Sequence, residues 1–99
     1  MILHLPTGKD QYLGVSEAGI GGRVIVRITY SDDQLKKVEV LEEHESEDVG
    51  QKAMDQLPKT MVELNTYEVD SVTGASTSSR ALKSAVKDAE QKAKHATEN

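Results

Sequence analysis

Cysteine is absent from this sequence of 99 residues, and so are tryptophan and phenylalanine. Without cysteine the chain can form no disulfide, offer no thiolate nucleophile and bind no metal through sulfur. Because tyrosine is the only aromatic residue type, the core must be built from valine, leucine, isoleucine, alanine and methionine. A chain of this size buries roughly 60–65% of its unfolded surface, which suits one domain with one modest core.

Basic residues are outnumbered, with 12 Lys and Arg against 17 Asp and Glu and a formal net charge of −5. This balance argues against nucleic acid as a partner, since binding to phosphates needs a basic face and aromatic platforms. The three histidines stand apart in the sequence, so no zinc ligand set is expected. No apolar run approaches the roughly 18 residues of a membrane span, and we expect no membrane contact within this chain.

Alternating hydrophobic residues predict an antiparallel sheet in the first half of the chain. Residues 9–16 fit a short strand, and a glycine-rich turn over residues 17–22 follows it. The polar turn at residues 31–34 is expected to join residues 23–30 to a partner strand at residues 35–42. The inward face of the middle strand is predicted to carry Val24, Val26, Ile28 and Tyr30.

Helical spacing replaces this alternation after residue 48. A first helix is expected over residues 48–56, with Pro58 beginning a second turn over residues 58–64 or marking a kink, because proline is costly inside a helix. The clearest helical pattern is an alanine-rich stripe over residues 80–95, whose small side chains permit a close approach to the sheet. The stripe consists of Leu82, Ala85, Val86, Ala89, Ala93 and Ala96.

These patterns predict an α+β fold with a small antiparallel sheet over residues 10–42. Two to three helices, near residues 48–64 and 78–96, are expected to pack on one face of that sheet. A short extended segment near residues 68–70 is a candidate to join the sheet. We expect a flexible N-terminal segment over residues 1–8, one domain over residues 9–96 and a tail over residues 97–99.

A stretch rich in hydroxyl groups, residues 70–79, precedes the last helical pattern. Gly74 and Ala75 allow the backbone to come close to a ligand. The helix is expected to begin with Thr77 or Ser78 as N-cap, so that its unpaired N–H groups and positive dipole end face the same place. These features outline a phosphate site, although hydroxyl-rich turns of this kind are more often structural caps only.

The residues of this stretch, Asp70-x-x-Thr73-Gly74-Ala75-Ser76-x-Ser78-Ser79, resemble the flavinylation motif of the FMN-binding domain family. In that family the hydroxyl residue directly after Gly-Ala is joined to the phosphate of FMN as a phosphoester. The resemblance implies that Ser76 is this residue. It also implies a surrounding cofactor site made of Asp70, Thr73, Gly74, Ala75, Thr77, Ser78 and Ser79.

The resemblance covers roughly residues 9–93. Near the start, Asp10-Gln11-Tyr12-x-Gly14 is similar to the family's opening Asp-Gly-x-Tyr-x-Gly. Further on, Glu45-Ser46-Glu47-Asp48-Val49-Gly50 is similar to its Glu-Thr-Pro-Gly-Ile/Leu-Gly segment, which implies contacts of Glu45 and Ser46 with the flavin ring. The chain departs from the family pattern where Glu47-Asp48 replaces Pro-Gly.

The family's known members include subunits of sodium-translocating NADH:quinone reductase and Rnf complexes, and fumarate and urocanate reductases. The resemblance therefore implies a redox carrier domain of a larger oxidoreductase, with FMN as cofactor and a partner domain or subunit that exchanges electrons with it. It also suggests a membrane-associated or extracytoplasmic parent protein.

No histidine that could act as a base and activate Ser76 lies near it in the sequence, so a separate flavin transferase is expected to attach the cofactor. The alternative is a ligand-binding or interaction module of the same fold without covalent flavin. An independent hydrolase is disfavoured, because no nucleophile and base can be paired.

Overall fold

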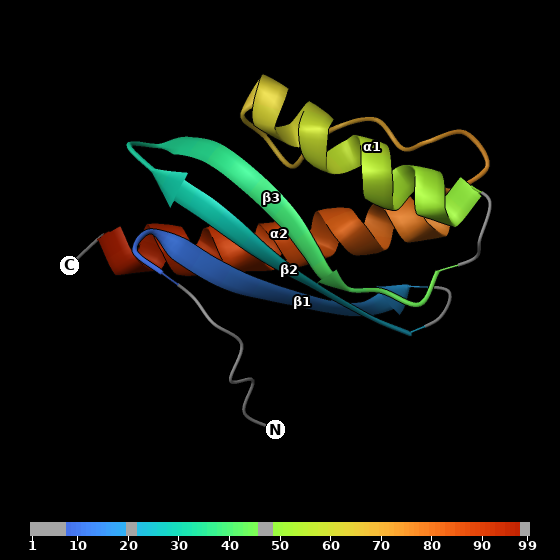
Figure 1. Ribbon diagram of the computed structural model, residues 1–99, viewed down its shortest axis with the longest axis horizontal. Coiled ribbons are helices and arrows are strands. Elements are labelled where there is room, and N and C mark those ends of the chain that lie inside the picture. The colour runs from blue at the N-terminus through green and yellow to red at the C-terminus, as the bar shows by residue number, and fades with distance from the viewer. Residues whose placement is uncertain (1–7, 20–21, 46–48, 98–99) are drawn as a thin grey trace.

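The computed structural model describes residues 8–19, 22–45 and 49–97. Three strands form one antiparallel sheet in the order β1-β2-β3, and two helices pack on it (Figure 1). The α+β prediction is therefore confirmed. In chain order the elements are β1 (Gln11–Gly19), β2 (Gly22–Ser31), β3 (Gln34–Glu42), α1 (Val49–Leu64) and α2 (Ser76–Thr97). Ser46, which we expected in the cofactor site, lies outside the described residues, as do residues 1–7 and 98–99.

The turn between β2 and β3 forms where the sequence predicts it. Asp32 and Asp33 have φ angles of 54° and 58°, and the flanking residues Ser31 and Gln34 pair across the hairpin. Two consecutive positive φ angles characterise the type I′ turn, whose twist matches that of the flanking strands. Aspartate tolerates this left-handed conformation better than most residues.

The register of the sheet puts one set of side chains against the helices. Tyr12 pairs with Ile28, and Ile28 pairs in turn with Val38, so side chains at every second position face the core. The opposite face carries the cross-strand ion pairs Arg23–Glu42 and Arg27–Glu39. The predicted inward residues of β2 are all buried: Val24, Val26, Ile28 and Tyr30.

Helix α1 runs without interruption from Val49 to Leu64, with Pro58 inside it. The expected second turn beginning at Pro58 is therefore wrong. A proline at this position forfeits one backbone hydrogen bond. Burial of the apolar face on both sides of Pro58 offsets that cost, since Met54, Leu57 and Met61 all belong to the core. The two methionines thus fill the core, although Met54 also borders a hollow described below.

Helix α2 packs closely on β1 and β2. Leu82, Ala85, Val86 and Ala89 are fully buried, which confirms the predicted alanine-rich stripe. A Cβ atom added at Gly14 of β1 would overlap the carbonyl oxygen of Ala85 and lie 2.8 Å from the backbone nitrogen of Ala89. The bare backbone of glycine therefore determines how near α2 can lie to the sheet.

Residues 68–70 form no strand, and the described sheet has only the three strands named above. The expectation that this segment joins the sheet is wrong. It runs instead from the end of α1 to the start of α2, and the ammonium group of Lys83 donates hydrogen bonds to Val69 O at 3.0 Å and Ser71 Oγ at 3.1 Å. In the described part of the chain, neither helix is long and apolar enough to span a bilayer.

Candidate functional site

A tight turn delivers the hydroxyl-rich stretch to the start of α2. The backbone N–H of Ala75 donates to Val72 O at 2.9 Å, which closes a β-turn over residues 72–75. Gly74, the third residue of this turn, has a φ of 84°, a left-handed conformation that side chains with a Cβ atom rarely adopt. Glycine is therefore the residue that lets the chain enter α2 in this direction.

Helix α2 begins at Ser76, one to two residues earlier than the predicted N-cap at Thr77 or Ser78, so that prediction is wrong. The first hydrogen bond of the helix runs from the N–H of Ser79 to Ala75 O at 2.9 Å, which makes Ala75 the N-cap. The N–H groups of Ser76, Thr77 and Ser78 precede this bond. By their position they have no partner within the helix, and they point out of its N-terminal end.

The four hydroxyl residues that begin α2 divide into two pairs. Ser76 and Thr77 are exposed, whereas Ser78 and Ser79 are 0% exposed. Ser79 Oγ accepts a hydrogen bond of 3.0 Å from the N–H of Val72, which holds the preceding turn against the helix. Of the four hydroxyl groups, only those of Ser76 and Thr77 are open to another molecule.

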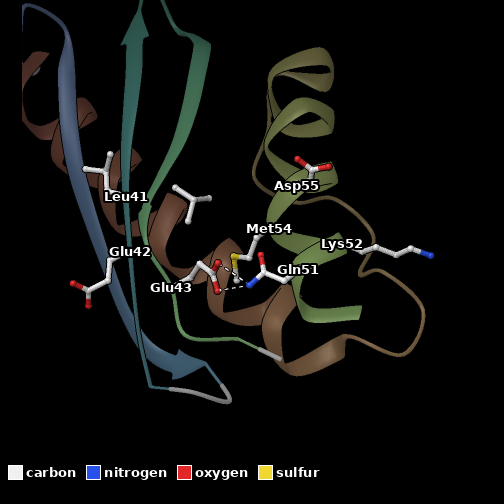
Figure 2. Close-up of a pocket in the computed structure, with 8 residues that line it drawn as sticks. Leu41, Glu42, Glu43, Gln51, Lys52, Met54 and Asp55 are labelled. Atoms are coloured by element: carbon white, nitrogen blue, oxygen red, sulfur yellow. Dashed lines mark hydrogen bonds between the residues drawn. The ribbon is translucent and has the colours of Figure 1, made fainter. Parts of the chain in front are cut away.

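The hydroxyl group of Ser78 donates a buried hydrogen bond of 2.7 Å to Glu45 Oε1. Glu45 is only 7% exposed, and its backbone N–H donates to Glu43 Oε1 at 2.9 Å. The Glu43 carboxylate in turn accepts two hydrogen bonds of 2.8 Å from the side-chain amide of Gln51 in α1, as Figure 2 shows. This chain of contacts ties the first turn of α2 to the first turn of α1.

A hollow of about 530 Å³ lies between α1 and the segment that leads to α2. Asp70 and Thr73, both exposed, border it on one side, and Lys52 of α1 borders it on the other. Its volume lies within the roughly 300–1,000 Å³ usual for cofactor sites. We call it the motif hollow, because residues 69–73 form one of its walls.

A second hollow of about 750 Å³ lies between the end of β3 and the start of α1 (Figure 2). Glu42, Glu43, Lys52 and Met54 are among the residues that line it. The side-chain hydrogen bond from Arg23 lowers the pKa of Glu42 below its ordinary value, and the two side chains form an ion pair at 2.8 Å.

Lys52 borders both hollows and was not predicted from the sequence. A single lysine in a predicted helix gives no signal of its own, because its neighbours in space belong to β3 and to the segment before α2. Within the described residues, no three His, Asp or Glu side chains form a group that could hold a metal ion.

Comparison with known proteins gives two results. The sequence profile of a family described as "FMN-binding domain" matches residues 19–91. Urocanate reductase of Eggerthella lenta is 38% identical over 82 residues, which is 83% of this chain. The match covers 13% of that reductase, so the chain spans only a small part of its length.

Proposed function

Because this chain belongs to the FMN-binding domain family, we propose that it is an electron-transfer domain whose FMN is joined to Ser76 through a phosphoester. The observation that carries this proposal is the position of one hydroxyl group. Ser76 is the first residue of α2 and is exposed, next to three N–H groups that have no partner within the helix.

The donor groups at the start of α2 fit a phosphate. A phosphodiester keeps one negative charge, and the N–H groups and dipole at a helix start stabilise such a charge by about 0.3–1 kcal/mol, or about 2 kcal/mol when partly buried. Arg80, exposed one turn further along α2, adds a positive charge on the same side, since helical side chains tilt toward the N-terminus. The residues of this chain therefore suit the phosphate end of FMN.

Attachment requires an enzyme other than this chain. A serine hydroxyl is a weak nucleophile unless a base activates it, and of the described histidines His44 follows β3 while His95 lies near the far end of α2. We propose a separate flavin transferase supplied with a flavin nucleotide. Ser76 Oγ forms a bond to the FMN phosphorus and gives up its proton. The bond from that phosphorus to the second nucleotide of a flavin dinucleotide breaks, and a nucleoside monophosphate leaves with the proton.

The other residues of the motif have distinct proposed roles. Gly74 provides the turn, and the buried Ala75 anchors it, so that Ser76 is presented to the transferase. Asp70 and Thr73 are exposed beside Ser76 in sequence and suit recognition. Thr77 completes the exposed rim of the site. The buried hydroxyl groups of Ser78 and Ser79 hold the helix start and the preceding turn in place through their hydrogen bonds to Glu45 and Val72.

The motif hollow suits a part of the flavin beyond the phosphate, because Asp70 and Thr73 belong both to its wall and to the motif. The expected ring contacts at Glu45 and Ser46 stay predictions, since the Glu45 side chain is 7% exposed and bonded to Ser78, and Ser46 lies outside the described residues. When bound, FMN accepts and donates one or two electrons, and the protein supplies the position and the electrostatic surroundings. The reductase relative favours a partner domain or subunit as the source or destination of those electrons.

The test is the intact mass of the domain after expression with a flavin transferase. We expect a gain of one FMN less one water, no gain in Ser76→Ala, and an unchanged gain in the control Ser84→Ala, which removes an exposed hydroxyl of α2 outside the motif. Without the transferase the protein should carry no added mass. An unmodified wild-type domain in the presence of an active transferase would favour the alternative, a module of the same fold without covalent flavin.

A further inference from the structure

The positive charge of this acidic chain is concentrated on α2. The helix contains five Lys and Arg residues and two acidic ones, although the whole chain has a net charge of −5. The remainder of the molecule is therefore strongly acidic. A partner that responds to charge would meet two very different surfaces.

Four of these cations share one side of α2 with Ser76. The four cations follow Ser76 by 4, 7, 11 and 18 residues, which places all of them within about 40° of it around the helix axis. In chain order they are Arg80, Lys83, Lys87 and Lys94. Arg80, Lys87 and Lys94 are exposed, and Lys83 is half-buried. This row, which we call the basic stripe, extends about 27 Å from the proposed flavin attachment point.

The charge of most of the basic stripe is left uncompensated; the exception is Lys94, whose charge acts on the buried carboxyl group of Glu90 on the same side of α2. In the described part of the chain, no ion pair involves Arg80 or Lys87. The hydrogen bonds of Lys83 go to a carbonyl and a hydroxyl oxygen, which leave its charge in place. The acidic residue Asp88 pairs with Lys92 at 3.3 Å, and both lie off the stripe.

We propose that the basic stripe is the docking surface for an acidic face of the redox partner, a second protein domain or subunit. This proposal rests on the proposed function, because the stripe begins where the flavin would be attached. Cationic side chains in a row attract an acidic surface and raise the rate of productive encounter. The acidic remainder of the molecule repels the same partner, so the partner approaches from the side of Ser76.

Other polyanions fit the stripe less well. Nucleic acid would meet one row of four cations on a chain that is acidic elsewhere. A membrane surface would need apolar side chains beside the cations. Among the described residues, Leu64 is the one large hydrophobic side chain that is exposed, and it belongs to α1.

The first experiment needs no flavin. The flavin-free domain is titrated with poly-L-glutamate at low salt while its backbone amide NMR signals are followed. We expect shifts over residues 80–94, and binding at least tenfold weaker in the double variant Arg80→Glu/Lys87→Glu. The control Lys36→Glu/Lys59→Glu changes net charge equally at exposed cations of β3 and α1 and should bind like the wild type.

Equal losses in the two double variants would overturn the proposal, since net charge alone would then explain the binding. Tighter binding to phosphatidylserine vesicles or to duplex DNA than to poly-L-glutamate would overturn it as well. Because this experiment does not use Ser76 or FMN, its failure is separate from failure of the proposed attachment.

The second experiment uses the flavinylated domain and ferricyanide, an anionic oxidant, as the probe. We expect the rate of flavin oxidation to fall about tenfold in Arg80→Glu/Lys87→Glu at low salt, and the difference to shrink as salt rises. The Lys36→Glu/Lys59→Glu control should retain most of the wild-type rate. Identical rates in both double variants at low salt would contradict the basic stripe as the site of approach.

Discussion

Residues 76–79 each carry a hydroxyl group, yet only two of these groups can meet a ligand. The sequence motif identifies Ser76, because its position after Gly74-Ala75 is visible in one dimension. It does not reveal that Ser78 is sealed from solvent, since the partner of that side chain is Glu45, 33 residues earlier in the chain. The residue contacts that shape the site are therefore the part that sequence patterns leave undetermined.

Ser78→Ala tests the buried contact at this scale. Removing the hydroxyl leaves Glu45 Oε1 without that donor in a site closed to solvent, which costs about 1–3 kcal/mol. We expect the free energy of unfolding in urea to fall by this amount. Thr77→Ala removes an exposed hydroxyl one residue away and should change the free energy of unfolding by no more than about 0.5 kcal/mol. Equal effects of the two substitutions would show that the contact contributes nothing.

The elements formed largely as their sequence periodicity predicts. The alternation over residues 23–30 and the polar turn after it specified the β2–β3 hairpin, because strand faces and turn chemistry are local properties. The break at Pro58 and the N-cap at Thr77 or Ser78 were wrong for different reasons. The course of α1 through Pro58 depends on tertiary contacts, namely those of Met54 and Met61 with the core. The start of α2 depends on a local turn over residues 72–75, which makes Ala75 the N-cap although alanine has no capping side chain.

The contact between β1 and α2 depends on the absence of a side chain at Gly14. In Gly14→Ala the added Cβ atom would collide with the backbone of α2 at Ala85 and Ala89, which cannot rotate away as a side chain can. We expect the free energy of unfolding to fall by about 3 kcal/mol. The matched control is Gly8→Ala, whose Cβ would meet only the side chain of Gln11. An effect below about 1 kcal/mol at Gly14 would contradict the close helix–sheet contact.

Glu90 of α2 gives the fold a pH dependence. Burial raises the pKa of this carboxyl group, an effect that Lys94 opposes and Glu68 reinforces. A raised pKa in the folded state adds stability in acid, and this stability is lost as the pH rises through the folded pKa. Glu90→Gln should therefore be more stable than the wild type at pH 7, with a difference that shrinks below the ordinary pKa of about 4.5.

Urea unfolding of both proteins at several pH values from about pH 3 to about pH 7, which lie on either side of the ordinary carboxyl pKa of 4.5, measures this difference. The exposed Glu63→Gln variant serves as the control and should follow the wild type throughout. A constant offset between Glu90→Gln and the wild type at every pH would show that the buried carboxyl group does not titrate differently in the two states.

At the scale of the whole molecule, the site lies where the first turns of both helices meet the end of the sheet. The hydrogen bonds from Gln51 through Glu43 and Glu45 to Ser78 join these parts at one end of the fold (Figures 1 and 2). The opposite end is the β2–β3 turn. The basic stripe, proposed above as a docking surface, runs along α2 away from this end of the fold.

The family and the candidate attachment residue follow from the sequence, but the surroundings of that residue do not. The motif hollow brings Lys52 near Asp70 and Thr73 only after α1 has packed beside the segment that leads to α2. The chain covers only 13% of its reductase relative, so the electron path proposed above stays a prediction.

The most direct test of the account is the position of the flavin phosphate on one tryptic peptide. Cleavage after Lys59 and Arg80 releases residues 60–80, which contain every hydroxyl group of the motif. After expression with a flavin transferase, fragment ions of this peptide should assign the added mass of one FMN less one water to Ser76. Assignment of that mass to Thr73 or Thr77, or its absence from the peptide, would contradict the central claim.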